Sequence, residues 1–244
     1  MSRRNDPVKV FESQGELRAD RSALTSQPWD ARNRLVSTLS GAAFQYDAFG
    51  RRSPKTTGGT ATNFLYDGVN AVQELSGTTP TANLLSGGVN ELFQRTDSSG
   101  MRNFLTDALG STLELADSTG TTQTQYTFEP FGNTATDGSA TTNSFAYAGR
   151  ELDGTGLYFN RARYYSPSLQ RFISEDPIRF TGGTNLYRYA ANDPLDFSDP
   201  FGLYDYSEKE TLERFLQPAY ERRDGGILSR PSEHTQPQSS WWGL

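Results

Sequence analysis

The sequence predicts an all-β protein whose repeated hairpins form a curved sheet that does not close on itself. Hydrophobic residues make up only 34% of the 244 residues, so the 12 Tyr and 15 Phe must supply much of the core. The 23 Gly and 12 Pro indicate many turns between short strands. A recurring aromatic–Asp pair marks the hairpins and predicts a repeat architecture.

Residues 1–27 form a polar N-terminal segment without a sustained hydrophobic period. Residues 28–103 hold YD-like repeats, marked by Trp29-Asp30, Tyr46-Asp47 and Tyr66-Asp67 at separations of 17 and 20 residues. In each repeat the Asp carboxylate is suited to accept turn N–H groups, and a following Gly or Asn accepts a positive φ. Such hairpins need neighbours to bury one face, which predicts a stacked, open sheet.

The second part of the body, residues 104–203, begins with a predicted hairpin. Its strands, 112–116 and 122–128, alternate in polarity around a turn at residues 117–120. Before it, residues 76–103 are rich in Gly, Ser, Thr and Asn and predict weakly defined strands with long turns. After it, residues 133–144 predict a flexible linker.

Aromatic residues are densest in residues 145–203. A strand of period two would present on one face Leu157, Phe159, Arg161, Arg163 and Tyr165. Two arginines on an apolar face need carboxylate or carbonyl partners when they are buried. Asp-Pro turns begin at Asp176 and Asp199, so we expect Arg161 or Arg163 to pair with a carboxylate, with Arg163 nearest these two aspartates.

The pattern changes after Leu203. Residues 204–244 form a variable C-terminal tail, in which Ser207 and Glu210 make a capping box for a short helix over residues 207–217. Gly, Ser, Pro and Gln then predominate, and they predict a disordered end to the chain.

Several motifs follow one another in the order of a known family. They are Leu105–Ser111 (LTDALGS), Glu129–Asn133 (EPFGN), Ala148–Glu151 (AGRE), Gly156–Tyr165 (GLYFNRARYY), Arg171–Pro177 (RFISEDP), Gly183–Tyr187 (GTNLY), Asn192–Pro194 (NDP) and Asp199–Leu203 (DPFGL). Residues 104–203 resemble the Rhs repeat-associated core of Rhs/YD-repeat proteins, which are related to the C subunits of insecticidal toxin complexes. The resemblance is weaker over the aromatic–Asp repeats and absent after Tyr204.

The resemblance implies a role as the core, or closing element, of a hollow polymorphic-toxin delivery shell used in bacterial competition. It also implies one self-cleavage of the aspartyl type between Leu203 and Tyr204. The family's two aspartates and its upstream arginine fall on Asp176, Asp199 and Arg163. Two carboxylates divide the proton transfers of peptide hydrolysis between an acid and a base.

The sequence departs from the family pattern at two positions of the core. Arg179 stands where the family often has Gly, and Ser166 stands where Asp usually precedes Pro167. The repeat region is also short for a whole shell.

The composition limits the classes of partner and cofactor that we expect. The net charge is −6 with no dense Lys/Arg run, so we expect no nucleic-acid partner, and no apolar stretch is long enough for a membrane span. Without Cys and with His234 as the single His, we expect no metal and no cofactor. The expected partners are an upstream Rhs shell or the chain's own C-terminal segment, together with secretion-system or immunity proteins. The N-terminus lacks an apolar signal core, so secretion or surface display would use a route without a Sec signal.

Two other functions stay open at this stage. An Asp-Pro turn is by itself an ordinary β-turn, so the chain could be a truncated Rhs structural fragment that does not cleave. The clustered Tyr side chains could also serve a cell-surface carbohydrate-binding module, which would need an exposed row of Tyr rings.

Overall fold

The computed structural model describes residues 28–203 and 206–207, and this part of the chain is almost entirely β-structure. The strands are β1 (Ala43–Tyr46), β2 (Arg52–Thr57), β3 (Thr60–Asp67), β4 (Asn70–Ser76), β5 (Thr79–Ser86), β6 (Leu92–Asp97), β7 (Gly100–Thr106), β8 (Thr112–Ala116), β9 (Thr122–Phe128), β10 (Thr134–Gly138), β11 (Glu151–Leu152), β12 (Tyr158–Asn160), β13 (Arg163–Ser166), β14 (Arg171–Phe172), β15 (Phe197–Ser198) and β16 (Tyr206–Ser207). Helix is limited here to three short 3-10 segments: η1 (Tyr147–Gly149), η2 (Arg179–Gly182) and η3 (Ala190–Asn192).

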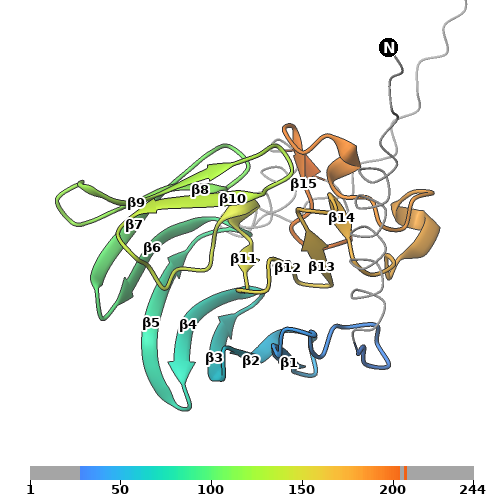
Figure 1. Cartoon of the computed structure of the whole chain (residues 1–244), viewed down its shortest axis with the longest axis horizontal. Helices are drawn as coiled ribbons and strands as arrows, with labels where there is room; N and C mark the ends of the chain where they lie inside the picture. Colours follow the sequence, from blue (N-terminus) through green and yellow to red (C-terminus); the bar gives the residue numbers. More distant parts are fainter. Residues whose placement is uncertain (1–27, 204–205, 208–244) are drawn as a thin grey trace, which may run out of the picture.

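Strands β1 to β10 form one antiparallel sheet in which each strand pairs with the next along the chain. This strip of hairpins curves strongly, and its first and last strands do not pair with each other (Figure 1). The open, curved, all-β architecture predicted from the repeats is therefore confirmed. The helix predicted over residues 207–217 lies outside the described residues, apart from Ser207 in β16, and so does the predicted disordered tail.

The turns of the repeats are capped by their own aspartates. Oδ1 of Asp30 accepts the backbone N–H groups of Arg32 and Arg34, both at 2.9 Å. Asp47 does the same for the equivalent residues of the next repeat, also at 2.9 Å. One carboxylate oxygen thus satisfies two turn donors, which is why Asp follows the aromatic residue in this unit.

Successive repeats are linked by arginine and tyrosine. The guanidinium groups of Arg34 and Arg51 bind the capping aspartate of their own repeat and lie 4.5 and 5.2 Å from the ring centres of Tyr46 and Tyr66 in the next one. Each of these Tyr hydroxyls donates at 2.7 Å to the carbonyl of the residue that follows the arginine. The aromatic–Asp pair therefore joins hairpins as well as shaping turns.

The strip is longer and more regular than expected. Residues 76–103 form β5 to β7 with short turns, and residues 134–138, predicted as part of a flexible linker, form β10 on the edge of β9. The predicted linker was wrong because Thr-rich residues without an apolar alternation still pair on an edge strand. The predicted boundary at residue 104 falls inside β7, whereas the hairpin predicted at residues 112–128 is confirmed.

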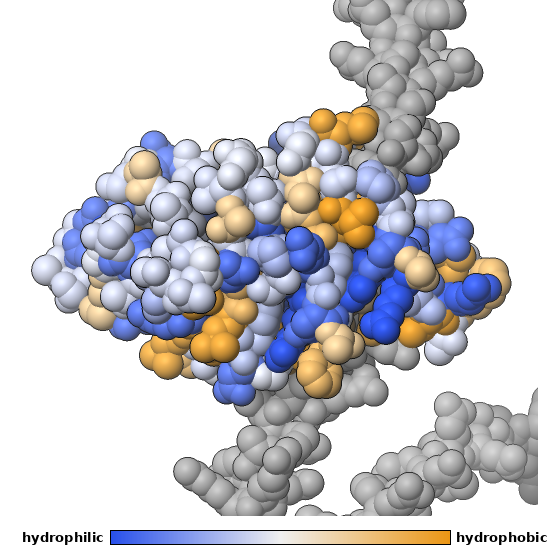
Figure 2. Space-filling view, turned by 90° about the horizontal axis from the view of Figure 1, so that it is seen from below, coloured by the Kyte–Doolittle hydropathy of each residue, from blue (hydrophilic) through white to orange (hydrophobic). Residues whose placement is uncertain are grey.

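The two faces of the strip differ in exposure. Leu65, Leu85 and Leu105 are exposed on alternate strands of one face, where they alternate with amide pairs such as Gln73–Asn83. On one side of the molecule, hydrophobic residues lie in small groups between hydrophilic ones (Figure 2). The other face of the strip is buried and packs toward the rest of the chain.

A second sheet, β11 to β14, lies against the inner side of the strip (Figure 1). The chain reverses at Arg161–Ala162, where Arg161 has φ 56°, so residues 156–165 form a hairpin and not the single strand with one shared face that period two predicted. Tyr158 lies opposite Tyr165 on one face and Phe159 lies opposite Tyr164 on the other. The reason is that a left-handed residue at position 161 makes a tight turn that the alternation does not reveal.

Both faces of this second sheet are packed with aromatic rings. On one face Tyr165 stacks on Tyr189 with ring centres 4.1 Å apart. On the other, Tyr164 contacts Phe44 of β1 with ring centres 5.1 Å apart. These rings give the aliphatic-poor chain its core and join the second sheet to the strip.

A buried ionic cluster joins the same two parts. Arg52 and Lys55 of β2 each lie 2.5 Å from a carboxylate oxygen of Glu151 in β11, and Arg52 lies 3.3 Å from Asp153. Arg52 is fully buried. Burial opposes ionisation of Glu151, but Arg52 and Lys55 outweigh it and hold the pKa of Glu151 at about 2.

The lowered pKa of Glu151 makes its contribution to folding depend on pH. Stability from this group is complete above the ordinary carboxyl pKa and is lost as pH falls from about 4.5 towards 2. Urea titrations at several pH values measure this dependence. As the pH falls over this range, the free energy of unfolding of the wild type should decrease by about 3 kcal/mol more than that of Glu151→Gln. Glu74 and Asp153 have raised pKa values through burial and act in the opposite sense, so the difference between the two proteins is the quantity to compare. Parallel pH profiles for both would contradict this account.

Candidate functional site

Arg163 begins β13, directly after the Arg161–Ala162 turn, and is 3% exposed. Its Nη2 lies 3.1 Å from Oδ2 of Asp176 and 3.2 Å from Oδ2 of Asp199. The expectation that Arg163 pairs with a carboxylate near these residues is confirmed. The three predicted site residues therefore meet around one buried guanidinium. They come from three separate segments of the sequence.

Both aspartates are buried in the turns that they begin, at 6% and 1% exposure. The second oxygen of Asp176 accepts the backbone N–H of Ile178 at 2.9 Å. The second oxygen of Asp199 accepts the backbone N–H of Leu203 at 3.0 Å. Asp199 thus contacts the residue whose carbonyl belongs to the predicted scissile bond. Tyr204, on the other side of that bond, lies outside the described residues.

Four consecutive residues bind four consecutive carbonyls at this point, and we call this arrangement the carbonyl clamp. The side chain of Asn160 donates to the carbonyl of Asp199 at 2.7 Å, and the backbone N–H of Ala162 donates to that of Phe201 at 3.0 Å. Nε of Arg163 donates to the carbonyl of Gly202 at 2.5 Å. Between them, Arg161 donates to the carbonyl of Pro200.

The carbonyl clamp requires glycine at position 202. Gly202 has φ 68°, and a Cβ there would lie 2.5 Å from the carbonyl oxygen of Asn160 and 2.9 Å from the backbone nitrogen of Arg163. Sequence reasoning missed Asn160 and the clamp. The sequence feature that could have indicated it is a polar Asn at the end of an aromatic strand, directly before the residues that form the turn.

Arg163 has acceptors for the rest of its guanidinium. Nη1 donates to the carbonyl of Leu186 at 3.1 Å, and the group lies 3.7 Å from the ring centre of Phe172. Because every edge of the guanidinium is engaged, its position relative to both aspartates is well defined.

The two departures from the family pattern fit the local backbone. Arg179 has φ 55°, the left-handed conformation that glycine adopts without strain. Ser166 accepts the N–H of Leu169 on its hydroxyl at 3.3 Å, a turn-capping contact that an Asp side chain can also make.

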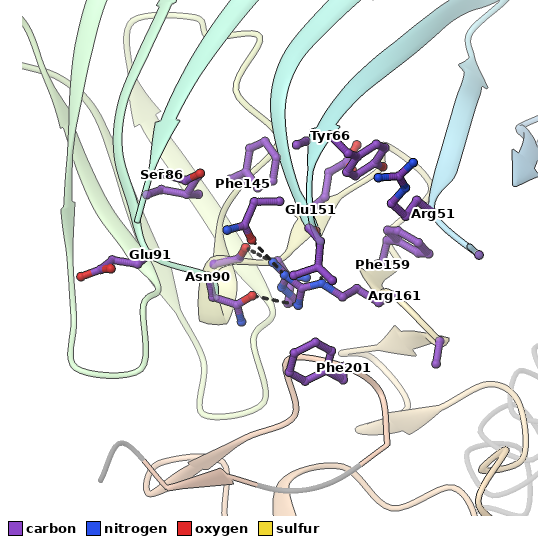
Figure 3. A pocket seen from close by; sticks show the side chains of 18 of the residues that line it. Arg51, Tyr66, Ser86, Asn90, Glu91, Phe145, Glu151, Phe159, Arg161 and Phe201 are labelled. Carbon is purple, nitrogen blue, oxygen red and sulfur yellow. Dashed lines mark hydrogen bonds between the residues drawn. The ribbon is translucent and has the colours of Figure 1, made fainter. Parts of the chain in front are cut away.

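A pocket of about 220 Å³ adjoins the clamp, between the strip and the second sheet (Figure 3). Arg161, Phe201 and Leu203 line it from the clamp side, and Asn90 and Phe145 line it from across the opening. It therefore lies beside the end of the Asp199–Leu203 turn.

Other chemistry is not indicated in the described part of the chain. Residues 28–203 and 206–207 contain no group of three His, Asp or Glu side chains arranged to hold a metal ion. His234 lies outside them. No helix in this part is long and apolar enough to cross a membrane.

An open strip of YD hairpins wrapped around a small aromatic sheet defines a YD-repeat shell protein. The chain belongs to the Teneurin YD-shell family, whose model matches residues 30–195. Its similarity to Rhs/YD-repeat toxin proteins is thereby confirmed.

Over 195 residues the chain is 32% identical to the tRNA nuclease WapA of Bacillus subtilis (strain 168), which covers 75% of this chain and 8% of WapA. Over 56 residues it is 39% identical to the double-stranded DNA deaminase toxin A of Burkholderia cenocepacia (strain H111), which covers 22% of this chain and 4% of that protein. Among solved structures it resembles the crystal structure of TcdB2-TccC3-TEV, with a TM-score of 0.57 and 25% identity over 72% of this chain and 10% of the other. The chain thus spans a tenth or less of the length of these relatives.

The buried guanidinium should make Arg163 important for stability. Arg163→Ala removes the positive partner of two buried carboxylates and a donor to two carbonyls, so the free energy of unfolding should fall by about 3–5 kcal/mol. Chemical denaturation followed by fluorescence gives the value. Arg171→Ala, an exposed arginine on the neighbouring β14, is the matched control and should change stability by less than about 1 kcal/mol. Equal effects of the two substitutions would contradict the arrangement.

Proposed function

We propose that this chain is the closing core of an Rhs-type polymorphic-toxin delivery shell and that it cuts itself once, between Leu203 and Tyr204. One observation carries the proposal: Arg163 binds both Asp176 and Asp199, while Asp199 also accepts the N–H of Leu203. A self-cleaving site needs acid–base groups near a defined peptide bond, and the contact of Asp199 with Leu203 supports such an arrangement.

The proposed step is hydrolysis by a divided acid and base. One carboxylate removes a proton from a water molecule while the oxygen of that water adds to the Leu203 carbonyl carbon. The other, in its protonated form, gives its proton to the Tyr204 nitrogen as the carbon–nitrogen bond breaks. The products are a carboxylate on Leu203 and an amine on Tyr204. The carbonyl clamp keeps the Leu203 end in place during both transfers.

The proposed reaction gives the two carboxyl groups different roles. One acts as the acid and the other as the base, and both are in contact with Nη2 of Arg163.

The relatives support a carrier role for the described part. The two whose names state an activity, tRNA nuclease and double-stranded DNA deaminase toxin, differ in that activity yet each resembles this chain over a small share of its length. Activities that differ between proteins are not explained by the part that they share with this chain. A shared shell element that delivers different cargo accounts for both.

In this role the proposed partners are an upstream Rhs shell and the chain's own C-terminal segment. Secretion-system and immunity proteins are the remaining proposed partners. The protein would act outside the producing cell, in competition between bacteria, after export by a route without a Sec signal.

A second function, a shell element that does not cleave, uses the same fold with a site that only stabilises the turns. The carbohydrate-binding alternative required an exposed row of Tyr rings, and the described part of the chain does not present one. The Tyr rings of β12, β13 and η1, and Tyr189 just before η3, are core residues, whereas Tyr187 is exposed.

The intact mass of the purified chain distinguishes cleavage from a purely structural role. The wild type should yield two pieces that meet between Leu203 and Tyr204. Asp176→Asn and Asp199→Asn should each abolish the cut, because neither carboxylate can perform both proton transfers.

Asp193→Asn is the matched control, because Asp193 also precedes a proline but is exposed and has no contact with Arg163. It should cleave at the wild-type rate. A folded wild-type chain of undivided mass would reject self-cleavage and leave the non-cleaving shell element.

A further inference from the structure

Two arginines beside the carbonyl clamp lack an acidic partner. Within residues 28–203, neither Arg150 nor Arg161 lies within ion-pair distance of a carboxylate, whereas Arg51, Arg52 and Arg163 each do. Arg150 is buried and Arg161 is half-buried. Charges removed from water are normally paired, since the transfer costs more than neutral hydrogen bonds return. An unpaired pair of arginines in one place therefore needs an explanation.

Arg161 is held entirely by neutral acceptors. It donates to the side-chain oxygen of Asn90 at 3.1 Å (Figure 3). It also donates to the side-chain oxygen of Asn70 at 3.4 Å and to the carbonyl of Pro200. Its guanidinium also lies 4.9 Å from the ring centre of Phe201. These contacts orient the group at the pocket wall without an ion pair, although the charge of Asp199 acts on it from a longer distance.

Arg150 is more deeply buried, at 7% exposure, and its Nε has no acceptor. It donates only to backbone carbonyls, those of Gly149 at 2.9 Å and Pro200 at 3.5 Å. Its neighbour Glu151 is committed to Arg52 and Lys55. Burial lowers the pKa of Arg150 to about 10, as expected for a cation without a direct counter-ion.

Both arginines line the same pocket, and so does Leu203. Phe145, Phe159 and Phe201 form much of the remaining wall. Two carboxylates also line the pocket, but Glu91 accepts the N–H of Gly88 and Glu151 is paired as described above. A site of this kind suits a single carboxylate joined to an apolar side chain. The chain reaches the pocket with a leucine, and hydrolysis after that leucine would create the missing carboxylate.

We propose that Arg150 and Arg161 form a binding site for the α-carboxylate of Leu203 after the chain has been cut, with the leucine side chain against the apolar wall. This inference rests on the proposed self-cleavage. It assigns the arginines a role after the reaction: the new end stays seated on the second sheet while the segment that begins at Tyr204 becomes a separate piece. Since the site carries positive charge before the cut, the negative charge formed there is stabilised without rearrangement of the core.

Carboxypeptidase digestion of the cut protein, followed by mass spectrometry, tests the site. A seated carboxylate is inaccessible to the enzyme, so Leu203 should be removed at least tenfold more slowly from the wild type than from Arg161→Met or Arg150→Met. Because Arg161 belongs to the carbonyl clamp, these proteins are compared as residues 1–203 and 204–244 produced together as two pieces. Arg51→Met is the matched control, because Arg51 lines the same pocket but is paired with Asp47. It should keep the wild-type protection. Equal trimming of the wild type and both test variants would overturn the proposal.

A second readout separates charge from a merely structural effect. In the cut wild type, ¹³C NMR titration of leucine carboxyl groups should give Leu203 a pKa below the ordinary α-carboxyl range of about 3.3–3.7. Arg161→Lys should retain part of that shift, which a loss of packing would not preserve. An ordinary pKa in the wild type would reject the site even if the methionine variants fail to fold.

A further arm makes the test independent of self-cleavage. Residues 1–203 and 204–244 produced together as two pieces carry the same Leu203 carboxylate without any cut. Protection in this form, with an intact mass for the single chain, would reject the proposed cleavage and support the carboxylate site. Cleavage of the single chain with no protection of Leu203 in either form would support self-cleavage and reject the carboxylate site.

Discussion

The arrangement of the core depends on the contact between two turns far apart in the sequence. The turn of residues 160–163 binds the four carbonyls of residues 199–202 in order, and Arg163 at its end reaches both Asp176 and Asp199. Backbone carbonyls in a buried turn must have donors, and a hairpin turn with exposed N–H groups and two arginines supplies them. The same contact requires glycine at position 202 and fixes the backbone directly before Leu203.

The body of the molecule is built to hold that contact. The strip is assembled by a repeated device in which Asp caps a turn, Arg binds that Asp, and Tyr of the next repeat lies under the Arg. Because each unit only links to its neighbours, the device sets no limit on length and does not close the sheet. The second sheet fills the inner side with aromatic rings and the Arg52–Glu151 ion pair, and the curved strip packs against this buried core.

Charge in this interior is distributed unevenly. The cluster around Glu151 contains acids and bases in contact, and the site around Arg163 has one base for two acids. Beside it, Arg150 and Arg161 have only neutral acceptors. The two regions lie side by side, and the charge of Asp199 opposes the lowering of the Arg161 pKa by burial.

Much of the architecture followed from the sequence because it is local. Turn capping by Asp30 and Asp47, the hairpin at residues 112–128 and the open sheet all arise from contacts within a few residues or between neighbouring strands. The meeting of Arg163 with Asp176 and Asp199 was also anticipated, through the family motifs and the need of a buried arginine for a partner. The catalytic roles of these residues remain a prediction.

Only the tertiary structure decided the rest. Alternation over residues 156–165 suggested one strand, but Arg161 in a left-handed conformation turns the chain and puts Phe159 and Tyr165 on opposite faces. No pattern in the sequence pairs Asn160 with the carbonyl of Asp199, or leaves Arg150 without an acid. These features depend on which distant backbone groups come to lie side by side, and that is determined by packing of the whole core and not by the periodicity of any one segment.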